Sequence, residues 1–91
     1  MDIEVKHDKE NERFVAEVRG DKAYLSYNIV NDKINFSSTF TPPESRRKGI
    51  AKMVVEYAFN YAKENNLKVI LSCSYEQAFV ERNDKYKDLL A

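Results

Sequence analysis

Residues 3 to 40 alternate hydrophobic and polar positions, which is the pattern of half-buried β-strands. The residues that share an apolar face are Ile3, Val5 and His7, then Phe14, Ala16 and Val18, then Ala23, Leu25, Tyr27 and Ile29, and finally Ile34, Phe36, Ser38 and Phe40. The segment Asn31-Asp32-Lys33 is a hairpin signal, because Asn and Asp tolerate the positive φ of a tight turn. The pattern therefore predicts four antiparallel strands connected as a meander.

The spacing of the apolar positions changes after Pro42-Pro43. From about Ser45 to Asn65 they recur every three or four residues, which predicts one face of an amphipathic helix. That face is expected to contain Ile50, Met53, Val54, Tyr57, Ala58, Tyr61 and Ala62. The segment Glu64-Asn65-Asn66 suits the helix end, because Asn readily takes the left-handed cap conformation.

A nearly continuous apolar run, LKVILSC at residues 67–73, predicts a strand in a central position covered on both faces. Residues 74–82 predict a short helix with Ala78 and Phe79 facing inward, whereas residues 83–90 remain open between conformations. The order of four strands, helix, strand and helix predicts a single α+β domain over residues 1–91. The strands before and after the long helix should be parallel neighbours joined by a right-handed crossover.

Composition and charge narrow the possible classes of function. The chain of 91 residues is 43% hydrophobic and 33% charged, as expected for one soluble globular domain. Its 15 basic and 15 acidic residues cancel. A nucleic-acid-binding protein usually has a basic excess, so we expect no nucleic-acid partner.

The sequence also lacks the usual signs of secretion, membrane insertion and metal binding. The N-terminal residues are polar, and no segment approaches the roughly 20 apolar residues of a membrane helix. Cys73 is the only cysteine and cannot form an internal disulfide. One Cys and one His fall short of a structural zinc site. We therefore expect a cytoplasmic protein without a metal and without a membrane partner.

A basic stretch, SRRKGIAK at residues 45–52, precedes and begins the long helix. The first-turn amide groups of a helix have no internal partner, and with the helix dipole they form an anion site. Gly49 permits a close backbone approach, and Ala51 keeps the first turn free of bulk. Arg46, Arg47, Lys48 and Lys52 add positive charge, which is unfavourable at a helix N-terminus without a bound anion.

The alternative interpretation of this stretch is an ordinary helix start with solvated charges. Its spacing matches neither a Walker A loop nor the three-glycine dinucleotide fingerprint. The physics of the residues leaves both interpretations open.

Residues 46–51, Arg-Arg-Lys-Gly-Ile-Ala, match the Q/R-x-x-G-x-G/A acetyl-CoA signature of the GNAT superfamily of N-acetyltransferases. The chain resembles very small, single-domain GNAT-like proteins that carry Pro-Pro-Glu before this signature and Cys-Ser-Tyr after the next strand. The resemblance covers nearly the whole chain and is strongest from Thr39 to Tyr75. It implies a compact GNAT fold, a mostly antiparallel five-stranded sheet with one parallel βαβ unit.

The resemblance further implies that acetyl-CoA lies in a cleft where the two parallel strands splay apart. Its acetyl group would pass directly to a primary amine of a small molecule, or to a protein lysine or N-terminus. The residues expected to bind the cofactor are Phe40, Thr41, Arg46, Arg47, Lys48, Gly49, Ile50, Ala51, Lys52, Cys73 and Ser74. We expect a monomer or a weak homodimer.

Two residues after the last predicted strand are candidates for catalysis. Cys73 is either a nucleophile near the thioester or a small buried hydrophobe at a strand end. Tyr75 either protonates the leaving thiolate or is a core or rim aromatic. The Tyr that acts as acid in larger relatives aligns with Arg82, so that acid is not matched. His7 is expected at the surface.

Two departures from the family pattern keep other functions open. Residues 6–14 leave room only for a turn where larger GNAT enzymes insert acceptor-binding helices. Close relatives tend to have His-Thr where this chain has Ser38-Thr39, so an imidazole base is missing. A non-catalytic CoA- or acyl-CoA-binding module or partner subunit is therefore the main alternative, and a nucleic-acid or protein interaction domain is a third.

Overall fold

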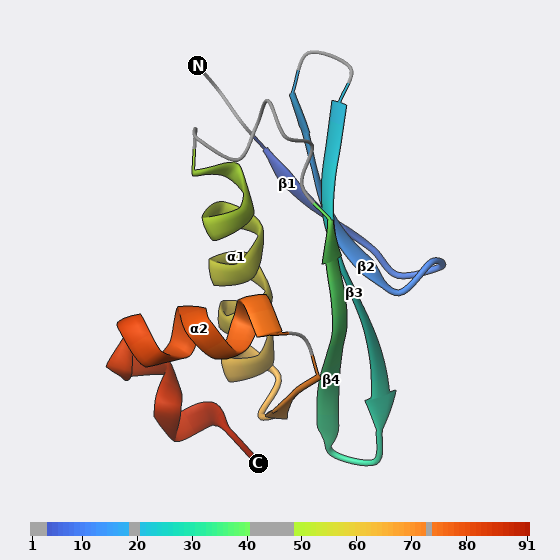
Figure 1. Ribbon diagram of the computed structural model, residues 1–91. Helices are drawn as coiled ribbons and strands as arrows, with labels where there is room; N and C mark the ends of the chain where they lie inside the picture. Colours follow the sequence, from blue (N-terminus) through green and yellow to red (C-terminus); the bar gives the residue numbers. More distant parts are fainter. Residues whose placement is uncertain (1–3, 19–20, 41–48, 73) are drawn as a thin grey trace.

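The computed structural model describes residues 4–18, 21–40, 49–72 and 74–91 (Figure 1). It contains one five-stranded sheet with the strand order β1-β2-β3-β4-β5. The strands are β1 (Val5–Asp8), β2 (Arg13–Val18), β3 (Asp21–Val30), β4 (Lys33–Phe40) and β5 (Lys68–Leu71). The helices are α1 (Ile50–Glu64), α2 (Ser74–Arg82) and the short 3-10 helix η2 (Asp84–Leu89).

The sheet confirms the predicted α+β fold and its order of elements. Strands β1 to β4 pair antiparallel in sequence, and β5 pairs parallel to β4 after the α1 crossover. Asn31 turns the β3–β4 hairpin with φ 59°, and Asn66 follows α1 with φ 54°. Both asparagines thus adopt the left-handed conformation that the sequence predicted for a turn and a helix end.

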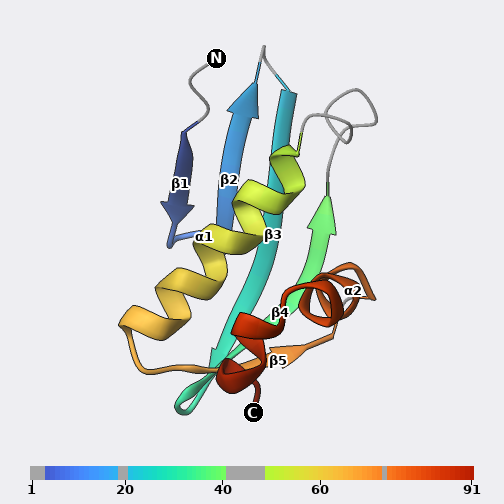
Figure 2. The same ribbon diagram turned by 90° about the vertical axis from the view of Figure 1, so that its left-hand side faces the viewer.

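All the helices lie on one face of the sheet, as Figure 1 shows. Figure 2 shows α1 crossing β2 and β3, with α2 and η2 beside β4 and β5. The sheet contributes Phe14, Leu25, Ile34 and Phe36 to the core, and α1 contributes Ile50, Val54, Val55, Ala58 and Phe59. None of the described elements covers the opposite face, here called the open face.

The buried side of α1 is rotated from the predicted one. Met53 and Tyr57 are 38% and 39% exposed, so their predicted burial is wrong. Ala51, Val55 and Phe59 are buried in their place. Helix α1 packs against α2 and η2 as well as against the sheet, and Phe59 lies between Phe36 and Tyr86 with ring centroids 5.2 Å and 4.7 Å away. An apolar face predicted from the sequence of one helix cannot include its contacts with α2 and η2, which lie elsewhere in the chain.

A bulge in β4 corrects the predicted face of Phe40. Ser38 pairs with Ser26 and Phe36 pairs with Tyr27, which leaves Ser37 as the extra residue. One inserted residue moves every later side chain to the other face of a strand. Phe36 is therefore in the core, whereas Phe40 is 46% exposed on the open face beside Tyr24.

Strand β5 lies at the edge of the sheet, so its predicted central position is wrong. Val69 is buried, but Ile70 is 37% exposed. The C-terminus partly pairs the outer edge of β5, because the Ala91 N–H donates to the Val69 carbonyl at 2.9 Å. The apolar residues of this segment are explained by the C-terminus beside β5 and by η2, whose Tyr86 is buried in the core.

Helix α2 also departs from the predicted pattern. Phe79 is buried as expected, but Ala78 is exposed. Val80 and Glu76 occupy the buried face beside Phe79.

Candidate cofactor site where the parallel strands separate

Strand β4 is paired with β5 only along its first half, whereas β5 is paired along its whole length. The parallel pairing runs from Lys33 with Lys68 to Phe36 with Leu71, and the Ser72 N–H closes it by donating to the Phe36 carbonyl at 3.2 Å. Strand β4 then continues to Phe40, whereas the chain after β5 turns away into α2 (Figure 2). The β4 bulge lies at this same level. The parallel strands therefore diverge toward their carboxyl ends, where ligands of such sheets bind.

Among the described residues, no side chain caps the N-terminus of α1. Gly49 is the N-cap with φ 72° and ψ 17°, and it makes no side-chain cap hydrogen bond. The first turn of α1 contains no acidic residue. Because the Met53 N–H is the first to bond back, at 3.1 Å to the Gly49 carbonyl, the preceding amides have no place in the helical ladder.

The first two residues of α1 belong to the core, whereas the third lies at the surface. Ile50 and Ala51 are both buried, at 0% and 6% exposure. Lys52 is exposed, and its Nζ lies 3.8 Å from the Glu56 Oε1. Within the described residues, the helix start thus combines amides outside the helical ladder, a positive dipole end and the cation of Lys52, which is the chemistry of an anion site.

A shallow hollow separates α1 from α2 on the same side of the sheet. Its volume is about 510 Å³, and Lys52, Ala78, Phe79, Arg82 and Asn83 line it. Lys52 and Arg82 give it positive charge from both helices, while Phe79 supplies an apolar wall. This combination suits a ligand that carries both an anionic and an apolar part.

A buried carboxylate, which the sequence interpretation missed, ties α2 to β4. Glu76 is 0% exposed, and the Thr39 hydroxyl donates a hydrogen bond to its Oε1. Its Oε2 has no hydrogen-bond partner among the residues that the structure describes. A sequence signal was present, because Glu76 lies three and four positions before the apolar Phe79 and Val80 on one helix face.

The structure describes only part of the predicted cofactor set. Gly49, Ile50, Ala51 and Lys52 form the start of α1, Ser74 begins α2 and is exposed, and Phe40 ends β4. The Phe40 side chain lies on the open face, away from the helices. Thr41, Arg46, Arg47, Lys48 and Cys73 lie outside the described residues, as does the side chain of Tyr75.

His7 is not the surface residue that the sequence predicted. It is half-buried, its Nε2 shares a hydrogen bond with the Tyr27 hydroxyl, and its ring stacks on Phe14 with centroids 4.5 Å apart. Desolvation lowers the pKa of His7, Lys9 lowers it further, and Asp8 opposes them. Burial likewise raises the pKa of Tyr27. His7 therefore belongs to an aromatic cluster between β1 and α1.

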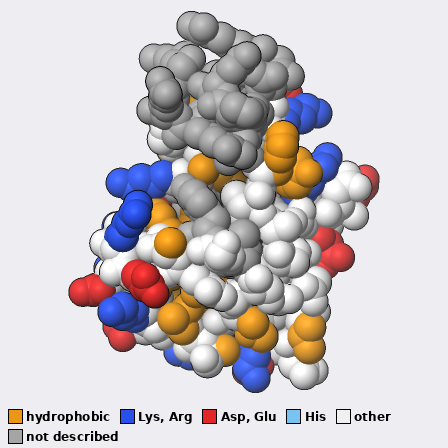
Figure 3. Space-filling view, viewed as in Figure 1, with side chains coloured by type: hydrophobic (Ala, Val, Ile, Leu, Met, Phe, Trp, Pro, Cys, Tyr) orange, Lys and Arg blue, Asp and Glu red, His pale blue; other side chains and the backbone are white. Residues whose placement is uncertain are grey.

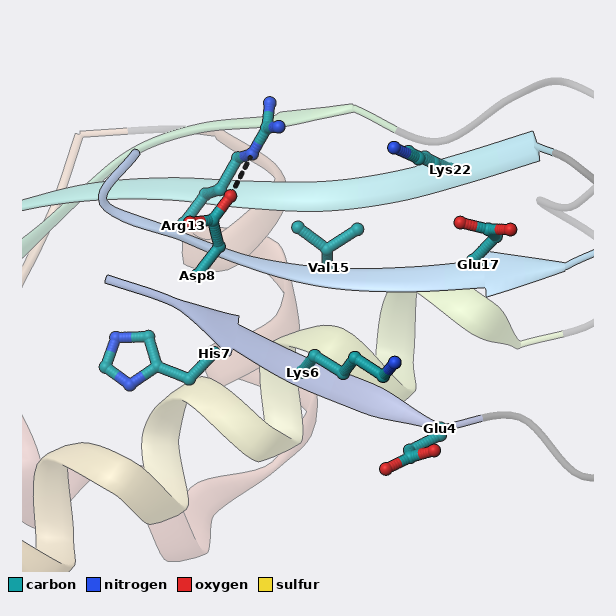
Figure 4. A pocket seen from close by; sticks show the side chains of 8 residues that line it. All are labelled: Glu4, Lys6, His7, Asp8, Arg13, Val15, Glu17 and Lys22. Atoms are coloured by element: carbon teal, nitrogen blue, oxygen red, sulfur yellow. Dashed lines mark hydrogen bonds and ion pairs between the residues drawn. The ribbon is translucent and has the colours of Figure 1, made fainter. Parts of the chain in front are cut away.

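A second hollow lies over β1, β2 and β3, with a volume of about 600 Å³ (Figure 4). Its charged lining residues alternate in sign: Glu4, Lys6, Asp8, Arg13, Glu17 and Lys22. The Asp8 carboxylate pairs with Arg13 at 3.4 Å, and its hydrogen bond with the Asn11 side chain lowers its pKa. Figure 4 shows the His7 ring pointing away from these charges. The mixed lining favours no single class of ligand.

The face of the molecule seen in Figure 3 shows no concentrated charge among its described residues. Figure 3 shows Lys and Arg side chains interspersed with Asp and Glu on the described part of this face. Within the described ranges, no helix is long and apolar enough to cross a lipid bilayer. Those same ranges contain no group of three His, Cys, Asp or Glu residues that could hold a metal ion.

Diverging parallel strands beside a glycine-led helix are the arrangement that the resemblance to the GNAT superfamily implied for this α+β domain. The chain matches the family model for the GCN5-related N-acetyl-transferase over residues 13–89. It belongs to this family, which confirms the resemblance drawn from its sequence.

Individual relatives agree with this assignment. The chain is 34% identical over 84 residues to Protein NATD1 of Gallus gallus, covering 89% of this chain and 76% of the relative. Protein NATD1 of Danio rerio is 36% identical over 84 residues, with coverage of 89% and 76%. A GCN5-like protein from Staphylococcus aureus, solved by NMR, superimposes with a TM-score of 0.78 at 30% identity, covering 97% of this chain and 87% of that one.

Proposed function

We propose that this protein is an acetyl-CoA-dependent N-acetyltransferase that moves the acetyl group from the thioester to a primary amine. The observation that carries this proposal is the divergence of β4 and β5 beside the uncapped N-terminus of α1. Membership of the GCN5-related family supports the same reaction class.

The described residues fit the anionic part of acetyl-CoA. The amides of Ile50 and Ala51 would hold the pyrophosphate, and Lys52 would add charge. A Cβ placed on Gly49 would meet no atom of the described residues within 4 Å, so these residues leave space beside this backbone. Arg46, Arg47 and Lys48 complete the predicted anion site. Acetyl-CoA supplies an activated thioester there.

The acceptor side of the proposed site is open. A turn at residues 9–12 connects β1 to β2. According to the resemblance, larger GNAT enzymes insert acceptor-binding helices at this point. An open side can admit a small amine or an exposed protein amine. Cys73 as acyl relay and Tyr75 as acid remain predictions for this site.

The direct test is release of CoA thiol from acetyl-CoA in the presence of polyamines, aminoglycosides, amino acids or lysine peptides. We expect release that depends on both the protein and one class of amine, above the hydrolysis measured without amine. Absence of release across the panel would contradict the proposal.

The second candidate is a CoA-binding module without catalysis, favoured by the direct turn between β1 and β2. Saturable acetyl-CoA binding with no thiol release from any amine would support it over the transferase.

The route of transfer is tested by intact mass spectrometry after incubation with acetyl-CoA. A gain of one acetyl group in the wild type that is absent in Cys73→Ala supports an acyl relay. An unmodified protein that still turns over with amine supports direct transfer.

A further inference from the structure

Glu76 is the one charged side chain that is buried in the described part of the chain. None of the ion pairs between described residues includes it. An ionised carboxylate removed from water is strongly unfavourable unless other groups compensate. Its position in the first turn of α2 supplies some compensation, because the helix dipole is positive there. The Thr39 hydroxyl supplies more.

Thr39 and Glu76 meet across the gap that the diverging strands leave. Thr39 lies on β4 beyond its last pairing with β5, and Glu76 lies on the segment that turned away from β4. Thr39 is half-buried, whereas Glu76 is fully buried. Thr39 is thus the accessible member of the pair, and Glu76 is the hidden one.

The direction of their hydrogen bond determines what Thr39 can do. An ionised carboxylate only accepts, so the Thr39 O–H is committed to Glu76. The lone pairs of the Thr39 oxygen then remain available as an acceptor, with the Glu76 carboxylate directly behind it. An ammonium N–H is the matching donor, because charge-assisted hydrogen bonds are the stronger ones. An anion or an uncharged acceptor group finds no partner there.

We propose that Thr39, backed by Glu76, binds the ammonium group of the acceptor and removes one of its protons. This rests on the proposed function. The ammonium N–H proton passes to the Thr39 oxygen as the Thr39 proton passes to Glu76. The neutral amine forms the C–N bond to the acetyl carbonyl, the C–S bond breaks, and the second amine proton goes to the CoA thiolate. Glu76 then returns its proton through the Thr39 hydroxyl, which passes a proton to solvent after the product has left.

This assignment provides the proton acceptor that the sequence lacks at Ser38-Thr39. Thr39 contacts the amine, and Glu76 acts through it as a positioning residue and proton acceptor. A general base of this kind typically contributes about 100-fold or more to the rate.

The test compares Glu76→Gln, Thr39→Val and Thr39→Ser with wild type, using Glu81→Gln on the exposed side of α2 as the matched control. We expect Glu76→Gln and Thr39→Val to lower kcat/KM for the amine by about 100-fold. Thr39→Ser should retain most activity, and Glu81→Gln should match wild type. Acetyl-CoA affinity by calorimetry should stay within about two-fold in all four variants. Wild-type turnover by Glu76→Gln, or a loss that follows acetyl-CoA affinity, would overturn the proposal.

An equilibrium experiment separates this inference from the proposed function. Wild-type protein labelled with ¹⁵N is titrated with n-propylammonium and with tetramethylammonium, which has no N–H donor. We expect a saturable shift of the Thr39 amide with n-propylammonium alone, lost in Glu76→Gln and in Thr39→Val. A saturable shift without turnover of any amine would contradict only the proposed transferase activity and would support the ammonium site. Turnover without that shift would overturn only the ammonium site. If Glu76→Gln does not fold, the Thr39→Val and Thr39→Ser pair decides the outcome.

Discussion

Glu76 and His7 are ionisable side chains whose surroundings come from residues distant in the sequence. Glu76 is buried against Thr39, and His7 packs among Phe14, Tyr27 and Tyr61. Each shares a face with apolar residues in its own element, but an ionisable side chain is ordinarily expected at the surface. Burial of each depends on tertiary packing, so the sequence alone did not identify either environment.

Protonation of His7 is expected to destabilise the fold. Its folded-state pKa lies below the ordinary value of 6.5, so the unfolded chain binds more protons between the two values. The free energy of unfolding should therefore fall as the pH drops from 6.5 through the folded-state pKa, and level off above 6.5. Urea unfolding of wild type and His7→Phe between these limits measures the effect.

His7 is the only histidine in the chain, so the comparison is clean. The His7→Phe variant should lose the slope just below pH 6.5 that the wild type shows. An identical slope in both proteins would show that other groups cause it.

Replacing Glu76 by an apolar residue should stabilise the protein while impairing transfer. Glu76→Met keeps a similar volume and removes a carboxylate whose Oε2 has no hydrogen-bond partner among the described residues, and such an unsatisfied buried group costs about 1–3 kcal/mol. We expect a higher urea midpoint together with loss of amine acetylation. A lower midpoint would instead show that the carboxylate holds α2 in place.

At the level of elements, the sequence predicted the strands, helices and their order, because alternation and three- to four-residue spacing are local properties. The left-handed Asn31 and Asn66 were predictable for the same reason. The β4 bulge, the rotation of α1 and the edge position of β5 were not, since each depends on a partner element. Phe40 shows the consequence, because the bulge at Ser37 places it on the opposite face from Phe36.

The rotation of α1 predicts a sharp difference between two of its apolar residues. Phe59 is fully buried, and Phe59→Ala should cost about 3–5 kcal/mol of the free energy of unfolding. Met53 is 38% exposed, and Met53→Ala should cost less than about 1 kcal/mol. Equilibrium urea unfolding gives both values. Equal losses of unfolding free energy for the two substitutions would instead support the predicted apolar face that includes Met53.

For the whole molecule, the candidate site could be located from the sequence more completely than its chemistry. The glycine-led basic stretch and the strand order placed an anion site at one edge of the sheet. The structure adds the separation of β4 from β5 and the bond between Thr39 and Glu76. Thr39 and Glu76 are 37 residues apart in the chain, and no local sequence pattern predicts a contact over that separation.

Calorimetric titration with acetyl-CoA tests the central claim most directly. S-acetylpantetheine serves as the comparison ligand, because it carries the thioester without the pyrophosphate. We expect saturable binding of one acetyl-CoA per chain and much weaker binding of S-acetylpantetheine, since the N-terminus of α1 would hold the pyrophosphate. No saturable heat with acetyl-CoA at micromolar protein, or equal affinity for both ligands, would contradict the account.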